Sequence, residues 1–285
     1  MKNKILDIIQ ASLVADTYSL GSHWIYSVEE LKNNNLDWKN LNAPLAAWHG
    51  TKQKGDFTHY GDQLVCLYEY INKNKEFDFV HYIKIWKEYM EKYTGYKDGS
   101  TTDTIKNLNE NQNIPCGAIS HDLSIIGRIT PLLLVSKDEK AFLNNVNNFV
   151  SLTHDSEEVL ESAEFFAKVL WAVIIGYPIV KSIKDISERY SQRLQDYVTS
   201  GLTNSNNTLE AIHEFGPACS INGGFQGIVY ILNKYGNNYE KALTQNAKAG
   251  GDSSARAMII SMLLIASNGL EIVPKNWITQ MNYKM

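Results

Sequence analysis

The chain has 285 residues, 44% of them hydrophobic, and a formal net charge of −4. This length and composition support a large hydrophobic core and exclude an intrinsically disordered or fibrous protein. The lysines and arginines are dispersed and form no basic stripe, so we expect no nucleic-acid partner. These properties predict a single globular domain over residues 1–285.

The three cysteines, Cys66, Cys116 and Cys219, lie far apart and lack the paired spacing of a zinc site or a disulfide framework. We interpret them as reduced thiols in the core. The longest apolar stretches, residues 170–180 and 257–266, are shorter than the roughly 18 residues that span a membrane. With no secretory signal pattern at the N-terminus, we expect a cytoplasmic protein without a membrane partner. The oligomeric state stays open.

Helical periodicity dominates the chain, and convincing alternating strands are absent. Apolar residues recur every three or four positions in several series: Ile5, Ile9 and Leu13; Phe79, Ile83, Trp86, Met90 and Tyr93; Phe142, Val146 and Phe149; and Val159, Ala163, Ala167, Leu170 and Ile174. Asp155 with Glu158 resembles a capping box before the last series. The pattern predicts an all-α domain of about ten or more helices.

Two segments do not fit a helical pattern. Residues 33–62 are rich in Asn, Trp, Gly and His, and residues 95–116 are rich in Asn, Thr and Gly. We predict long loops here, and long loops in a compact domain are often functional. The acidic, hydroxyl-rich string Ser100 to Thr104 is interpreted as a helix cap.

An acidic residue stands at the end of the first loop. Residues 55–63 read GDFTHYGDQ, after which apolar residues continue at helical spacing. Asp62 either caps this helix or contributes a carboxylate to a cation site with a second such helix start. His59 and Tyr60 precede it and are candidates for contact with a ligand.

Two further junctions between loop and helix carry polar residues. Residues 120–131 read SHDLSIIGRITP and include Ser124 and Arg128, and residues 153–155 read THD. Ser124 and His154 are candidate substrate-binding residues, although a histidine at a helix entrance is often structural. We expect Arg128 to pair with a buried carboxylate rather than with a substrate.

The most informative junction lies near the C-terminus. Residues 246–257 read NAKAGGDSSARA and lead into an apolar helix. Paired glycines allow positive φ angles and a close approach to a ligand, while Asp252 and Ser254 carry oxygens that suit a hard cation. The alternative is an ordinary turn with Asp252 as the helix cap.

Aromatic residues cluster early in the chain and could form a stacking surface, although most are expected in the core or in loop packing. They are Trp24, Tyr26, Trp38, Trp48, Phe57 and Tyr60. Walker-type, dinucleotide-binding, HExxH and nucleophile-elbow motifs are absent, as is a DDxxD-like acidic pair, which excludes several common enzyme classes.

Taken together, the junctions resemble the motifs of the ADP-ribosylglycohydrolase family over nearly the whole chain. The C-terminal GGDSSARA is similar to the family's GGDTDT-type motif, and four other strings follow the family's order. These are ASLVADTYSLG for its N-terminal GxxxGDAxG helix, GDFTHYGDQ for TDDT, SHDLSIIGRITP for the loop before the arginine-proline helix, and LTHDSEEV for its TH motif. The resemblance implies a single orthogonal multi-helix all-α domain with a two-magnesium centre that releases ADP-ribose.

Two acids of the family pattern are missing. The family's Thr-Asp-Asp is matched here to Tyr60-Gly61-Asp62, and Asp252-Ser253-Ser254-Ala255 stands where it has Asp-Thr-Asp-Thr. The acid expected after the N-terminal motif is not evident in residues 22–26. This pattern resembles the branch that includes J-type crystallins. Because carboxylate charge holds hard cations, one Mg²⁺ is expected rather than two.

The resemblance therefore implies two alternative functions. In the first, Asp62 and Asp252 are catalytic, and with Ser254 they hold Mg²⁺ for cleavage of an ADP-ribosyl or related glycosidic bond. His154, Ser124, Tyr60 and His59 would then bind the small-molecule or ADP-ribosylated substrate, with the general base unassigned among His59, Glu29 and Glu30. In the second, the chain is a non-catalytic member that binds ADP-ribose or a nucleotide, or serves a structural role.

Overall fold

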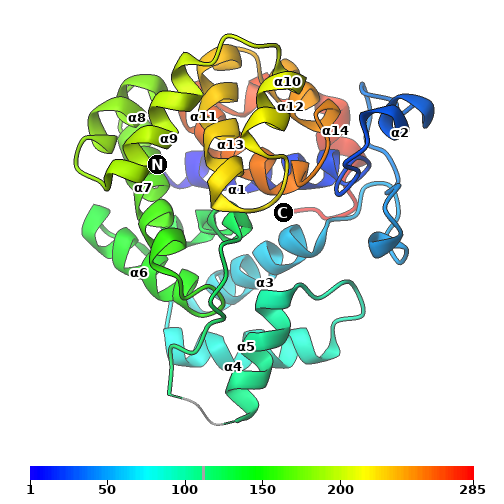
Figure 1. The fold of residues 1–285 in the computed structure, drawn as a ribbon. Coiled ribbons are helices and arrows are strands. Elements are labelled where there is room, and N and C mark those ends of the chain that lie inside the picture. The colour runs from blue at the N-terminus through cyan, green and yellow to red at the C-terminus, as the bar shows by residue number, and fades with distance from the viewer. Residues whose placement is uncertain (111–112) are drawn as a thin grey trace.

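The structure is a computed structural model that describes residues 1–110 and 113–285, and every regular element in these ranges is a helix (Figure 1). Only isolated bridges of β type occur there. The α-helices are α1 (Lys2–Ser19), α2 (Val28–Asn33), α3 (His59–Asn74), α4 (Phe79–Lys92), α5 (Gly99–Asn109), α6 (Glu139–Ser151), α7 (Glu157–Ile174), α8 (Ile179–Ser187), α9 (Gln192–Thr203), α10 (Thr208–Phe215), α11 (Ile221–Tyr235), α12 (Tyr239–Lys248), α13 (Ser253–Asn268) and α14 (Lys275–Gln280). The all-α prediction is confirmed.

Four short 3-10 helices complete the fold: η1 (Ala47–His49), η2 (Leu123–Arg128), η3 (Thr130–Val135) and η4 (Leu270–Ile272). The two in the middle of the chain follow each other at the third junction, where Asp122 caps η2 through the Ser124 N–H. Pro131 stands at the start of η3 and ends the run of η2. This region packs against both α3 and α13, so it lies beside the predicted site.

The centre of the molecule is the pair α1 and α13, which pack along each other. Every residue of α13 from Ser253 to Ala266 is buried, and most of them are apolar on all sides of the helix. A helix with this composition is stable only inside a core. Its first turn therefore places Asp252 and Ser254 in the interior rather than on the surface.

The remaining helices surround this pair. In Figure 1, α8 to α12 lie in the upper part of the molecule, α6 and α7 lie on the left, and α3, α4 and α5 form the lower part. The helix α3 contacts α1, η2 and α4. The start of α3 therefore reaches the start of α13 through the interior, which brings the first loop and the C-terminal junction together.

The structure corrects three local predictions. Residues 95–116 do not form a long loop, because α5 occupies Gly99–Asn109, with Thr101 and Thr104 buried despite their low helix propensity. The cap of α5 is Asp98, so the string Ser100 to Thr104 lies inside the helix. Likewise α7 is capped by Ser156 and not by Asp155.

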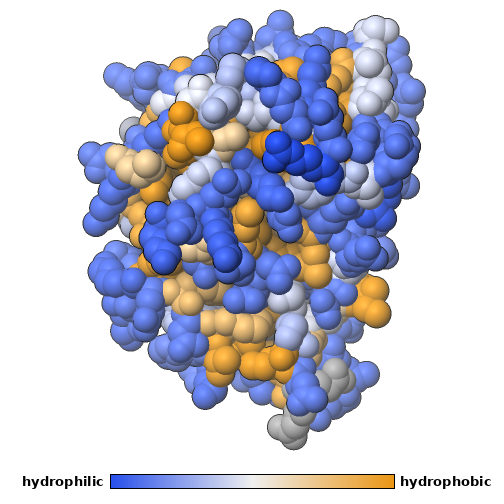
Figure 2. Space-filling view, turned by 90° about the vertical axis from the view of Figure 1, so that its left-hand side faces the viewer, coloured by the Kyte–Doolittle hydropathy of each residue, from blue (hydrophilic) through white to orange (hydrophobic). Residues whose placement is uncertain are grey.

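The surface is mostly hydrophilic, and Figure 2 shows one face on which hydrophobic residues form a broken band in the lower half. No helix in residues 1–110 and 113–285 has both the length and the apolar composition needed to cross a bilayer. The three cysteines are all free thiols, as predicted, with Cys66 and Cys116 buried and Cys219 partly exposed.

Candidate functional site

The two glycines before α13 bring two backbone segments together. Gly250 and Gly251 have φ angles of +72° and +66°, which other residues rarely adopt. Gly251 accepts a 2.8 Å hydrogen bond from the Trp24 N–H and donates one of 2.8 Å to the Ile25 carbonyl. A β-carbon on Gly250 would collide with that carbonyl. The sequence predicted that these glycines allow close approach to a ligand. In the structure, the segment that approaches them is the backbone of Trp24 and Ile25.

Asp252 is the N-cap of α13 and also faces a buried polar cluster. Its Oδ1 accepts a 3.1 Å hydrogen bond from the Ala255 N–H, so the capping interpretation is confirmed. Its Oδ2 accepts hydrogen bonds from the Tyr60 hydroxyl at 2.8 Å and from Trp24 Nε1 at 3.4 Å. The side chain has no exposed surface, and burial raises the pKa of its carboxyl group.

The residue of α3 that reaches Asp252 is Tyr60, and Asp62 has other partners. The Asp62 carboxylate forms a salt bridge with the Lys52 ammonium and accepts a 2.5 Å hydrogen bond from the Tyr93 hydroxyl. Burial raises the pKa of Asp62, although Lys52 opposes this shift. Among the described residues, no hydrogen bond or ion pair joins Asp62 to Asp252. Thr58, not Asp62, caps α3.

A third carboxylate, Asp16 of α1, binds the predicted ligand Ser254. The Ser254 hydroxyl donates to Asp16 Oδ1, and Thr58 donates to Oδ1 from its hydroxyl at 2.6 Å and to Oδ2 from its N–H at 2.8 Å. Burial raises the pKa of Asp16 to about 6, which these donors oppose. A β-carbon on Gly61 would collide with the Asp16 carboxylate. The glycine at position 61 is thus required by the acid at position 16.

Three histidines meet beside Tyr60. His23 follows α1, His49 ends η1 and His59 begins α3, and one ring nitrogen from each lies within 4.8 Å of the other two. All three side chains are fully or almost fully buried. Within residues 1–110 and 113–285, no hydrogen bond is made by the Nε2 atoms of His23 and His49 or by either ring nitrogen of His59. We call these three residues the histidine cluster.

Two carboxylates lie behind the histidine cluster. His23 Nδ1 lies 3.5 Å from Asp252 Oδ1, and His59 Nε2 lies 3.4 Å from Asp98 Oδ2. Burial would raise the pKa of Asp98, but His59 and the Arg128 guanidinium hold it below its ordinary value. The predicted substrate-binding residue His59 therefore faces an ionised carboxylate in the interior.

Ser124 and His154 lie near Arg128, which also faces the Tyr60 ring. Ser124 accepts a 3.3 Å hydrogen bond from Arg128 Nη2, and the guanidinium lies 5.7 Å from the centre of the Tyr60 ring. His154 Nδ1 is 2.8 Å from the Thr153 hydroxyl, while its Nε2 has no partner. Burial lowers the pKa of His154 to about 3, with repulsion from Arg128. The role of both residues in substrate binding stays a prediction.

Asp252 also belongs to a second group of close polar atoms. A carboxylate oxygen of Asp122, the thiol of Cys219 and a carboxylate oxygen of Asp252 lie within 4.8 Å of one another. Burial raises the pKa of Asp122 to about 7, with repulsion from Asp252 and Asp98. Burial likewise raises the pKa of the Cys219 thiol, so it is protonated at neutral pH.

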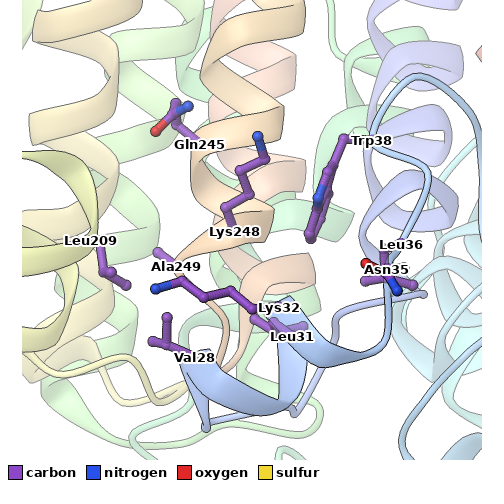
Figure 3. Close-up of a pocket in the computed structure, with 10 residues that line it drawn as sticks. All are labelled: Val28, Leu31, Lys32, Asn35, Leu36, Trp38, Leu209, Gln245, Lys248 and Ala249. Carbon is purple, nitrogen blue, oxygen red and sulfur yellow. The ribbon is translucent and has the colours of Figure 1, made fainter.

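A pocket of about 570 Å³ lies elsewhere, between α2 and the end of α12 (Figure 3). Val28, Leu31 and Lys32 of α2 form one side, while Lys248 lies over the Trp38 ring at 5.5 Å from its centre. None of the predicted site residues lines this pocket. The buried polar residues and the pocket are therefore separate features of the molecule.

The prediction from the sequence missed several residues at the centre of the buried polar site. Asp16, His23, Asp98 and His49 were not singled out, although they surround the named residues. For Asp16 a signal existed, because an acid in an otherwise apolar helix must be paired once buried. The histidines are separated by up to 36 positions along the chain, so their spacing carried no signal.

Comparison with known proteins gives a consistent result. The family model for ADP-ribosylglycohydrolase matches residues 1–284. Crystallin J1A and Crystallin J1B of Tripedalia cystophora are each 23% identical over 301 aligned residues, which cover 98% of this chain and 92% of each relative. A solved structure titled "ADP-ribosylglycohydrolase-related protein complex" has the same fold, with a TM-score of 0.78, 16% identity, and coverage of 99% of this chain and 93% of that one.

Proposed function

The chain belongs to the ADP-ribosylglycohydrolase family, and we propose that it is a non-catalytic member with a structural role. The observation that carries this proposal is that its three motif acids are bound by donors of the protein itself. Asp16 binds Thr58 and Ser254, Asp62 binds Lys52 and Tyr93, and Asp252 binds Tyr60, Trp24 and the backbone of its own helix. The similarity to two proteins named crystallins supports the same proposal.

The residues at this site do not fit Mg²⁺. The ion requires an octahedral set of oxygen ligands and is held mainly by carboxylate charge. The segment of α3 that faces Asp252 presents the Tyr60 ring and hydroxyl, with the His59 ring next to it. The positive charge beside Asp62 is already supplied by the Lys52 ammonium. The interior thus replaces the ligands of a hard cation with aromatic and cationic groups.

The competing proposal is magnesium-assisted hydrolysis of an ADP-ribosyl or related glycosidic bond. A bound Mg²⁺ supplies a Lewis acid that orients oxygens and activates water. With Asp62, Asp252 and Ser254 as ligands, this proposal requires Lys52 to leave Asp62 and requires Ser254 to leave Asp16. It also requires a substrate to reach Asp252, whose side chain has no exposed surface.

The test is turnover of N-linked and O-linked ADP-ribosyl substrates with and without Mg²⁺, together with calorimetric titration of Mg²⁺ and of ADP-ribose. We expect no turnover above the uncatalysed rate and no heat of Mg²⁺ binding. Turnover that depends on Mg²⁺ and is lost in both Asp62→Asn and Asp252→Asn would establish the hydrolase instead. ADP-ribose binding without turnover would show a binding role and would replace the structural one.

A surface control separates specific loss from general damage. Asp103 is an exposed acid on α5 that is far in sequence from the motif acids. Asp103→Asn should behave as the unaltered chain in every assay. Circular dichroism of each variant shows whether the fold is retained.

A further inference from the structure

We infer that the histidine cluster, His23, His49 and His59, is a binding site for one divalent transition-metal ion of the zinc class. This inference is independent of the proposed function, because a metal held by imidazoles serves a structural protein as well as an enzyme. It differs from a magnesium centre in both ligands and metal. The evidence is the convergence of the three rings, their free nitrogens and the carboxylates behind them.

The free ring nitrogens are the first part of the evidence. A buried polar atom without a partner costs about 1–3 kcal/mol, and nearly all such atoms in folded proteins are paired. Here Nε2 of His23, Nε2 of His49 and Nδ1 of His59 have no partner among residues 1–110 and 113–285, and all three residues are fully or almost fully buried. Each of the three converging rings therefore carries an unpaired nitrogen, and a metal ion would satisfy one nitrogen of each ring.

The protonation state suits a metal ligand. Burial lowers the pKa of His23 well below its ordinary value and lowers the pKa of His49 to about 2, and repulsion among the three rings adds to both shifts. Both imidazoles are therefore neutral at neutral pH. The neutral ring is the form that binds metals, so no proton has to be displaced from these two residues.

The carboxylates supply the second shell of such a site. In metalloproteins a histidine ligand commonly donates its other ring N–H to a carboxylate, which orients the ring and makes it more basic. His23 Nδ1 accepts a 3.4 Å hydrogen bond from the Ser254 N–H and lies 3.5 Å from Asp252 Oδ1, which leaves Nε2 as its unpaired nitrogen. His59 Nε2 lies 3.4 Å from Asp98, which leaves Nδ1 available. His59 thus has the carboxylate partner typical of a histidine ligand, and the Asp252 carboxylate lies close to the His23 ring.

The ligand chemistry selects the metal class. Imidazole nitrogens suit zinc, copper, nickel and iron, whereas Mg²⁺ prefers oxygen ligands. Three histidines with a fourth open position form a tetrahedral zinc site. In such a site the nitrogens lie roughly 3.3 Å apart, from Zn–N bonds of about 2.0–2.1 Å. The nitrogens here lie within 4.8 Å, so small side-chain rotations complete the site.

The surroundings hold the rings in place. The Trp24 ring stacks on the His23 ring, with 4.6 Å between ring centres, and on the His49 ring, with 4.9 Å. The backbone of Trp24 has a φ of +63°, which is rare for a bulky residue. Strained backbone of this kind marks functional positions. Tyr96 packs edge-on against Trp24, and the exposed Trp48 packs on Tyr96.

The experiment is titration of the full chain, first freed of metal with a chelator, with Zn²⁺ alone in a calorimeter. We expect one Zn²⁺ per chain and a rise in the unfolding temperature. Co²⁺ in its place should give the visible absorption of a four-coordinate nitrogen and oxygen site. His49→Gln and His59→Gln should each weaken Zn²⁺ binding at least about tenfold. Mg²⁺ should not compete.

Two controls make the result decisive. His121→Gln removes an exposed histidine outside the cluster and should leave Zn²⁺ binding unchanged. Cys219→Ala tests the group of Asp122, Cys219 and Asp252 and should also leave it unchanged. Absence of Zn²⁺ binding, or binding that is lost in Cys219→Ala but kept in His49→Gln, would overturn the inference. Circular dichroism excludes unfolding as the cause of any loss.

Discussion

Tyr60 and Asp252 are joined by a 2.8 Å hydrogen bond that connects the start of α3 to the start of α13. Both residues are almost completely buried, and burial raises the pKa of the Tyr60 hydroxyl as well as that of the Asp252 carboxyl group. The tyrosine therefore stays protonated and donates. In this chain the contact between the two motif segments is a hydrogen bond from a neutral hydroxyl to a carboxylate.

Removing that donor should destabilise the fold. In Tyr60→Phe, Asp252 Oδ2 keeps only the 3.4 Å contact from Trp24 Nε1 in an interior without solvent. We expect the free energy of unfolding in urea to fall by about 1–3 kcal/mol. Tyr283→Phe, which removes a hydroxyl from an exposed pair with Glu69, is the matched control and should change it by less than about 0.5 kcal/mol. Equal effects of the two variants would contradict this prediction.

Gly61 should not tolerate a side chain. An added β-carbon would meet the Asp16 carboxylate and lie 2.8 Å from Phe57 Cβ. Gly61→Ala should lower the free energy of unfolding by about 1–3 kcal/mol, because a packed interior cannot absorb the extra volume. Gly99→Ala is the control, since nothing lies within 4 Å of its β-carbon. It should be neutral or stabilising by up to about 1 kcal/mol. A neutral Gly61→Ala would refute the coupling between positions 16 and 61.

Two glycines with positive φ angles separate the cost of a steric collision from the cost of backbone strain. Gly250 and Gly176 both have positive φ angles, +72° and +105°, but only Gly250 would place a β-carbon against another backbone, that of Ile25. Gly176→Ala should cost about 1–2 kcal/mol from strain. Gly250→Ala should cost more, since the collision is added to the strain. Urea unfolding of both variants measures the difference, and equal losses would show that the contact with Ile25 is readily relieved.

Asp16 should make stability depend on pH. Burial raises its pKa from 3.8 to about 6. The folded state therefore binds the Asp16 proton more tightly than the unfolded state does. The resulting stabilisation of the folded state is fully present below the unfolded pKa and is lost as pH rises through about 6. The stability of the unaltered chain relative to Asp16→Asn should therefore fall between about pH 4 and pH 7. Urea unfolding across that range measures it, and a difference that rises with pH would show the opposite shift. Asp103→Asn, at an exposed acid of α5, is the control variant.

Much of the fold was predictable because it depends on local patterns. The apolar series Phe79 to Tyr93 became α4, which ends at Lys92 with Tyr93 as its cap, and Asp252 became the cap of α13. Helical periodicity and capping are set by residues within a few positions of each other. The errors arose where local signals compete, as in α5, where buried threonines and the Asp98 cap override a composition typical of loops.

The candidate site was less predictable, since helix geometry decides which side chains meet. Tyr60 and Asp62 are two residues apart on α3, and an α-helix turns by about 100° per residue. Their side chains therefore point about 200° apart around the helix axis, and only one can face Asp252. The tertiary structure gives that position to Tyr60 and directs Asp62 to Lys52 and Tyr93.

The sequence by itself determined the all-α class, several of the helices and the family, because each depends on periodicity or on motifs read along the chain. Only the tertiary structure decided that Asp16 meets Ser254 and that His23, His49 and His59 share one place. These contacts join segments from α1, η1, α3 and α13. Their distance in space depends on how the helices pack, which no local spacing records.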